Sequence, residues 1–284
     1  MTSGRLTCAA AGLAALAILG PAATASAATA GAARASAATA ATAAARPRAA
    51  GIGRAYSVEE AGYRASGIGW RFRLAQATVT LPRPSRSSYS SGESLSVQLR
   101  AADQTVVLGI SATPGEARWK AAVAVEQKDG QGGCSSTGGC FTHLNDNSPA
   151  FAPGDSVTFD LYYHRSAGTV YYKATDATLG QAFVGWFQDG GELFSNARVG
   201  VEFGPDSWTR GTGYRRPGTT RALATFTAVR FTSYGGIKGA LSGTRWRTSR
   251  LLVTSTRTSR GTVIASPSLP AGSDASSFLV AAVR

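Results

Sequence analysis

Apolar and polar residues alternate with a period of two over long parts of the chain after residue 50. The clearest case is the segment 156–163, in which every second residue is apolar (Val157, Phe159, Leu161 and Tyr163). Such alternation puts one face of a strand in a core and the other face in water. Three more apolar runs follow at residues 169–173, 182–187 and 199–203. We therefore predict a block of antiparallel strands between Phe151 and Phe203.

Further runs of the same kind flank this block and are separated by turn signals rich in Gly, Pro and Ser. They lie at residues 70–81, 95–99, 105–110, 119–125, 223–231, 251–253, 262–264 and 278–280. In the first of them the apolar parity changes, which predicts a β-bulge near residues 75–77. Residues 51–66 are interpreted as a lead-in. About ten to thirteen short strands without a sustained helical period predict an all-β fold, a two-sheet antiparallel β-sandwich of jelly-roll type.

The first fifty residues have the composition of a targeting and linker sequence. A basic start is followed by an apolar centre at residues 9–19 and by Ala25-Ser26-Ala27, which is typical of a cleaved signal peptide. We expect a signal peptide at residues 1–27, an Ala-rich disordered linker or pro-segment at 28–50, and a single β-sandwich domain at 51–284. No later segment has the ~18 apolar residues of a membrane helix. The mature protein is expected to be secreted, extracellular and not inserted in a membrane.

The chain is basic, with a net charge of +13, of which the four arginines of residues 1–50 supply four charges. A basic secreted protein stays near anionic surfaces such as cell-wall polymers, although the charge can also serve solubility alone. Arg245 and Arg247 flank Trp246, an arrangement that suits a polyanion. The alternative is a charged edge that blocks strand pairing. Because no nucleic-acid-binding motif accompanies them, nucleic acid is not the expected partner.

Two cysteines remain once the signal peptide is removed. In an oxidising compartment Cys134 and Cys140 are expected to form a disulfide across a short Gly-rich loop. Two thiols do not complete a zinc site. Residues 142–147 offer oxygen ligands but lack the spacing of a calcium loop. We expect no metal and no cofactor.

Aromatic residues are the strongest indication of a binding surface. Tyr162, Tyr171, Trp186 and Trp208 lie on or beside the central strands, and the first two point away from the aliphatic side of their strands. Aromatic rings exposed on a sheet can stack on sugar rings or polymer chains. The alternative is that each ring packs against the second sheet.

Catalysis would depend on carboxylates. The only histidines are His143 and His164, and the chain has no Gly-x-Ser-x-Gly motif, which argues against nucleophilic catalysis. Glu202 lies inside an apolar strand, where partial desolvation would suit a general acid. The alternative is an exposed carboxylate paired with an arginine. A glycosidase would need a second, facing carboxylate, for which Glu126 is a candidate.

Several short segments resemble, in order, those of the glutamic peptidase (eqolisin) family. They are FRLAQATVTLP at 72–82, VVLGI at 106–110, AVEQ at 124–127, APGDSVTFDLYY at 152–163 and VGWF at 184–187. The resemblance extends from Tyr63 to about Phe231. It implies a secreted sandwich of the concanavalin or lectin-like kind.

The family uses a Gln and a Glu that act on one water, and the resemblance implies that this pair is not intact here. The position similar to the family's Gln is Leu108 or Gly109. Glu126 is the nearest match to its Glu, and a later Ala-Glu-Trp segment is similar to residues 184–186, which lack the Glu. With a different alignment, Gln127 together with Glu126 or Glu202 is the substitute pair.

Two functions stay open from the sequence. The first is a secreted, monomeric, non-catalytic binding protein for a polysaccharide or an anionic cell-surface polymer. Its ligand-binding residues would be Tyr162, Tyr171, Trp186, Trp208, Arg245 and Arg247. The second is a secreted acid hydrolase, a glutamic-type endopeptidase or a glycosidase, that uses Glu126, Glu202 and Gln127.

Overall fold

The structure is a computed structural model of the chain. It describes residues 52–57, 60–83, 93–112, 117–127, 141–145, 148–189, 193–203, 224–242, 245–254, 260–270 and 275–282, all within one compact unit, residues 45–284. The expected signal peptide and linker, the disulfide between Cys134 and Cys140, and Trp208 lie outside the described residues.

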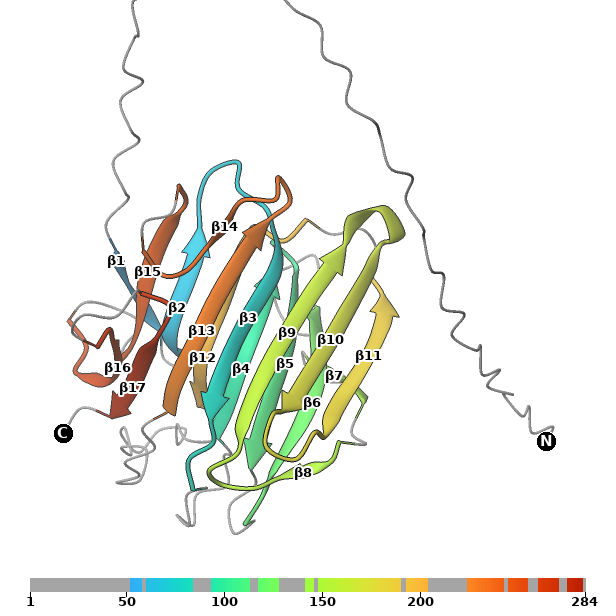
Figure 1. The fold of residues 1–284 in the computed structure, drawn as a ribbon. Coiled ribbons are helices and arrows are strands. Elements are labelled where there is room, and N and C mark those ends of the chain that lie inside the picture. The colour runs from blue at the N-terminus through green and yellow to red at the C-terminus, as the bar shows by residue number, and fades with distance from the viewer. Residues whose placement is uncertain are drawn as a thin grey trace, which may run out of the picture. The chain divides into compact units, whose positions relative to one another are not determined.

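The described residues form two layers of strands (Figure 1). The front layer consists, in order of hydrogen bonding, of β14 (Lys238–Gly239), β13 (Ala224–Ser233), β3 (Phe72–Thr80), β9 (Ser156–His164), β10 (Thr169–Asp176) and β11 (Ala182–Gln188). The rear layer consists of β2 (Glu60–Ser66), β12 (Asn196–Phe203), β4 (Glu93–Arg100), β5 (Gln104–Ala112), β6 (Trp119–Gln127) and β7 (Phe141–Asn145), with the short β8 (Ala150–Phe151) also paired to β6.

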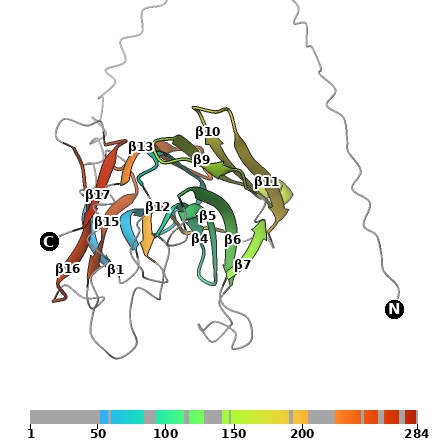
Figure 2. The same ribbon diagram turned by 90° about the horizontal axis from the view of Figure 1, so that it is seen from below.

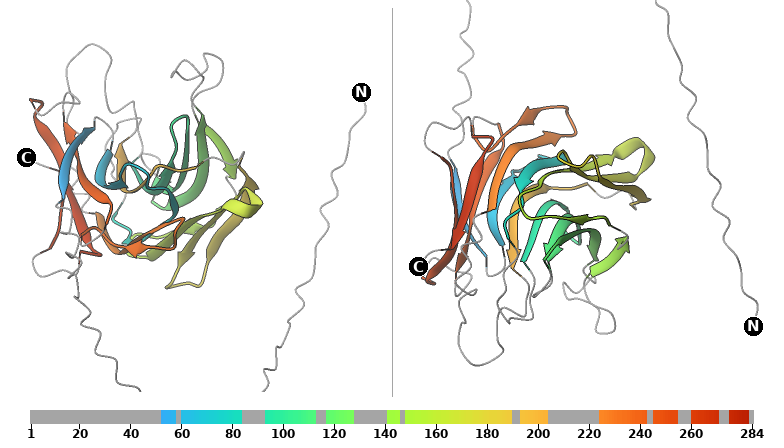
Figure 3. Two further views of the ribbon diagram at one scale, coloured as in Figure 1. Left: turned by 90° about the horizontal axis from the view of Figure 1, so that it is seen from above. Right: turned by 60° about the horizontal axis from the view of Figure 1, so that its bottom comes forward.

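Three strands join the layers along one side, so the two layers are parts of one curled sheet (Figures 2 and 3). They are β15 (Arg247–Thr254), β16 (Val263–Ser268) and β17 (Phe278–Ala282), which link β2 to β13. The pairings are antiparallel except that of β1 (Gly53–Ser57) with β15, which is parallel. A 3-10 turn, η1 (Arg165–Ala167), lies between β9 and β10. The predicted all-β, antiparallel, two-layer sandwich is confirmed.

The core lies between the layers because alternate residues of each strand point inward. In β9 the buried positions are Val157, Phe159, Leu161 and Tyr163, as the alternation predicts. The rear layer contributes residues such as Val97 and Val199. Trp119 is fully buried, and its indole nitrogen donates a hydrogen bond to the Pro82 carbonyl at 2.8 Å. The outward faces of both layers are left to carry polar and aromatic side chains.

Two sequence-based expectations need correction. The supposed lead-in at residues 51–66 contains two strands, β1 and β2. A register shift does lie beside Ala77, between the pairs Thr227–Thr78 and Arg230–Gln76, but its extra residue belongs to β13. The change of parity within β3 comes earlier, because Ser233 pairs with Phe72 while Thr232 pairs with Leu74, leaving Arg73 extra. No helix in the described part of the chain is long and apolar enough to cross a membrane.

Candidate functional site

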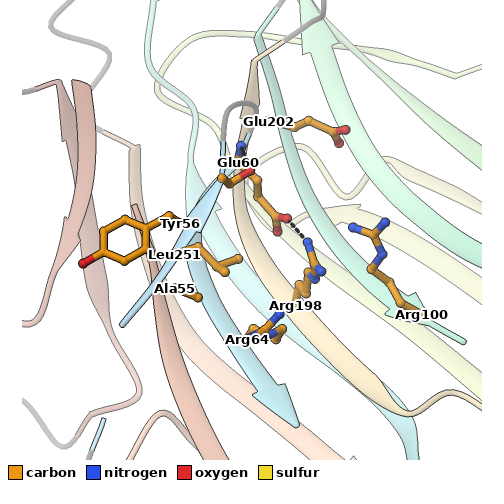
Figure 4. Close-up of a pocket in the computed structure, with 9 residues that line it drawn as sticks. Ala55, Tyr56, Glu60, Arg64, Arg100, Arg198, Glu202 and Leu251 are labelled. Atoms are coloured by element: carbon orange, nitrogen blue, oxygen red, sulfur yellow. Dashed lines mark hydrogen bonds and ion pairs between the residues drawn. The ribbon is translucent and has the colours of Figure 1, made fainter. Parts of the chain in front are cut away.

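Charged residues gather on the face of the rear layer that points away from the core. Arg198 of β12 is the register partner of Arg64 on β2 and of Gln98 on β4. Because these positions alternate with core residues, their side chains share the outward face. There Arg64 and Arg198 line a cavity of about 240 Å³ (Figure 4). The cavity is lined by Ala55, Tyr56, Ser57, Glu60, Arg64, Arg100, Arg198, Glu202 and Leu251.

Three guanidinium groups and two carboxylates line the cavity, and Glu126, outside the lining, pairs with one of the guanidinium groups. Arg198 is paired with Glu60, and both side chains are largely buried, at 15% and 6% exposure. Arg100 lies 3.7 Å from Glu126. Arg64 has no carboxylate within ion-pair distance among the described residues, and its Nε is buried without a hydrogen-bond partner.

Burial is the main influence on the ionisation of these arginines. It lowers the pKa of Arg64, and the nearby positive charge of Arg198 lowers it further, against the opposing charge of Glu60. Burial is also the largest cause that lowers the pKa of Arg100, and Arg198 lowers it further, against the opposing charges of Glu60, Glu126 and Glu202. Both groups stay charged at neutral pH, because an arginine side chain is effectively always protonated there. An added negative charge in the cavity would relieve this repulsion.

The floor beside the cavity is built from residues with little or no side chain. Gly62, Gly200, Ser96 and Gly109 are successive register partners across β2, β12, β4 and β5. Above this floor the Gln98 Nε2 donates a hydrogen bond to the Glu202 Oε2 at 3.4 Å. Gln98 is 2% exposed, and its Oε1 has no hydrogen-bond partner. Because these four residues have little or no side chain, the side chains of Gln98 on β4 and Glu202 on β12 have space to reach each other.

A second candidate surface lies on the outward face of the front layer. Tyr171 of β10 is the register partner of both Tyr162 on β9 and Trp186 on β11. The rings of Tyr162 and Tyr171 are 6.4 Å apart, and the Arg73 guanidinium lies 5.8 Å from the centre of the Tyr162 ring. Tyr171 is 44% exposed and Trp186 is 62% exposed. These two rings therefore do not pack against the second layer.

A polar row runs beside these aromatic residues. Arg230, Gln76, Asp160 and Lys173 are successive register partners across β13, β3, β9 and β10. Burial raises the pKa of Asp160, while its hydrogen bond with Gln76 and the charges of Arg230 and Lys173 act against this rise. The front layer thus offers hydrogen-bonding groups next to exposed rings.

Arg245 and Arg247 are exposed, but the tryptophan between them is not available to a ligand. Trp246 is 1% exposed and packs edge-to-face against Trp70 and Phe72. In the part of the chain that the structure describes, no three His, Cys, Asp or Glu side chains gather into a group that could hold a metal ion.

Comparison with known proteins relates the fold to one group of enzymes. No family model and no curated protein matches the chain. Among solved structures, scytalido-glutamic peptidase with a transition state analog inhibitor matches with a TM-score of 0.54 and 13% identity, over 80% of this chain and 99% of that one. SCP-B, a member of the eqolisin family in complex with the tripeptide Ala-Ile-His, matches with a TM-score of 0.50 at the same identity and coverage. The chain has the fold of the glutamic peptidases.

In this glutamic peptidase fold, the positions indicated by the sequence resemblance do not converge. Leu108 is buried in the core, whereas Gly109 faces outward on β5. Gly185 lies on β11 in the front layer, so it cannot share a water with Gly109. Glu126 forms an ion pair with Arg100. Gln127 ends β6 opposite Gln104, and the side chain of Gln127 is not among those that the structure describes.

The sequence reasoning singled out Glu202 as a candidate acid but missed the polar residues in and beside the cavity. The missed residues are Glu60, Arg64, Gln98, Arg100 and Arg198. A signal was present, because each is a charged or amide residue of opposite parity to the apolar residues of a short strand. Their convergence depends on which strands pair, and this is not visible in any one segment.

Proposed function

We propose that the protein is a non-catalytic binding protein that holds a polysaccharide on the outward face of its front layer. The observation that carries the proposal is the row of Tyr162, Tyr171 and Trp186, which are register partners on three adjacent strands. Adjacent strands are ~4.8 Å apart, so the row spans about 10 Å, enough to stack on successive sugar rings.

The surroundings of the row fit a sugar polymer. Gln76, Asp160 and Lys173 lie one register row away and provide donors and acceptors for hydroxyl groups. The positive net charge of the chain favours approach to anionic cell-surface polymers. Secretion, which the N-terminal sequence predicts, would bring the protein to such polymers.

Replacing Trp186 by alanine should weaken retention on insoluble polysaccharide about tenfold, the loss of roughly 1.4 kcal/mol expected for an exposed aromatic anchor. The measurement is a pull-down at physiological salt with glucan, chitin and peptidoglycan. Leu179→Ala is the matched control, because Leu179 is 58% exposed but lies outside the row. Absence of retention by the unaltered protein, or equal losses in the two variants, would contradict the proposal.

A second candidate function, an acid hydrolase, is favoured by the contact between Gln98 and Glu202 within a fold shared with glutamic peptidases. The two side chains touch each other directly at 3.4 Å, which leaves no space for a water between these atoms. We therefore expect no turnover of denatured casein or of glycans between acid and neutral pH. Turnover that is abolished in Glu202→Gln and kept in Glu126→Gln would favour the hydrolase instead.

A further inference from the structure

We propose that the cavity of the rear layer is a separate binding site for a sugar acid, with the carboxylate of the ligand held by Arg64. This site lies on the opposite layer from the aromatic row and does not depend on the function proposed for that row. The residues that line the cavity set three requirements for a ligand: a negative charge, several hydroxyl groups and a small size. A uronate residue meets all three.

The requirement for a negative charge comes from Arg64. Its neighbour Arg198 is already paired with Glu60, and Arg100 is paired with Glu126. Arg64 has neither an ion pair among the described residues nor a partner for its Nε. A guanidinium presents donors in a planar fork that matches a carboxylate. A ligand carboxylate would therefore supply the partner that the fold leaves out.

The requirement for hydroxyl groups comes from the acceptors around Arg64. The Glu60 Oε1 is buried without a hydrogen-bond partner, and so is the Gln98 Oε1 beside the cavity. Glu202 adds a second carboxylate to the lining. Carboxylates repel a bare anion such as phosphate but accept hydrogen bonds from hydroxyl groups. A ligand that combines one carboxylate with hydroxyl donors suits this mixture better than either a simple anion or a neutral sugar.

The volume of the cavity and its apolar side fit a single sugar ring. The cavity of about 240 Å³ can take a monosaccharide residue and is too small for a folded chain. Leu251 and Ala55, from β15 and β1, give it an apolar side (Figure 4). Apolar contact with the C–H face of a sugar ring would add to the polar contacts.

The test is calorimetric titration of the whole protein with glucuronate and galacturonate, with glucose, acetate and inorganic phosphate as comparison probes. We expect saturable binding of at least one uronate, and binding at least tenfold weaker for each comparison probe. Arg64→Gln should weaken uronate binding at least tenfold. Arg54→Gln makes the same charge change at an exposed neighbouring position on β1 that does not line the cavity, and it should bind like the unaltered protein.

Two further measurements separate a binding role from a structural one. Arg64→Lys keeps the charge but loses the fork, so it should melt close to the unaltered protein and still bind uronate several-fold more weakly. Trp186→Ala should leave uronate binding unchanged, because Trp186 is on the other layer. The proposal is overturned if phosphate or acetate binds as tightly as the uronates, if no uronate binds, or if Arg64→Gln and Arg54→Gln weaken binding equally.

Discussion

Replacing Glu60 by glutamine is expected to lower the free energy of unfolding by about 3 kcal/mol, the lower end of the range for breaking a buried ion pair. Glu60 and Arg198 expose only 6% and 15% of their side chains. Removing one partner therefore leaves a desolvated guanidinium uncompensated. The lower end applies because Arg198 keeps some access to water. Chemical denaturation at neutral pH, with the unaltered protein measured in parallel, gives the difference directly.

A double variant tests the physical reason for this loss. When both partners of a buried ion pair are replaced by apolar residues of similar volume, stability often returns. Glu60→Met combined with Arg198→Leu should therefore recover most of the loss caused by Glu60→Gln alone. A loss below about 1 kcal/mol in the single variant would place the pair in the class of surface salt bridges.

The front layer could be predicted from the sequence because its strands have strongly contrasting faces. The alternation from Val157 to Tyr163 defines β9 and its buried side. It also fixes Tyr162 on the opposite side, where the structure has it. The same reasoning, together with the resemblance to glutamic peptidases, gave the correct fold class. Sequence alone could not show that Tyr162, Tyr171 and Trp186 are mutual register partners, since register follows from tertiary pairing.

The rear-layer cavity could not be predicted because its strands give weak local signals. In β2 the buried positions include Ala61 and Ala65, and alanine is uncommon in strands. The segment therefore resembled a connection rather than a strand. Arg64 on this strand meets Arg198, which lies far along the chain on β12. No periodicity within either segment encodes that pairing. The proposed disulfide and the role of Trp208 fall outside the described residues and stay predictions.

The two candidate surfaces differ in shape and exposure, so they suit different ligands. The aromatic row is open and exposed, as a site for an extended polymer requires. The rear-layer cavity is small and polar, and Gln98 beside it is almost fully buried. A protein that contacts a polymer with one layer and a uronate unit with the other could bind two chains, or two parts of one chain. Binding through both layers would then be stronger than through either alone.

Replacing Gly62 by alanine is expected to cost about 3 kcal/mol, the upper end of the usual range for overpacking, and to open the floor beside the cavity. A Cβ at Gly62 would lie 2.1 Å from the Val199 carbonyl oxygen and 2.6 Å from the Cα of Gly200. Both are backbone atoms, so no side-chain rotation can relieve the clash, and β2 must move away from β12. Thermal and chemical denaturation measure the cost in free energy of unfolding.

Gly235→Ala is the matched control, because a Cβ at this position would meet only the Ser233 Oγ at 3.8 Å. This variant should change the free energy of unfolding by less than about 0.5 kcal/mol. Equal stability of the two variants would show that β2 and β12 do not approach as closely as the paired glycines indicate.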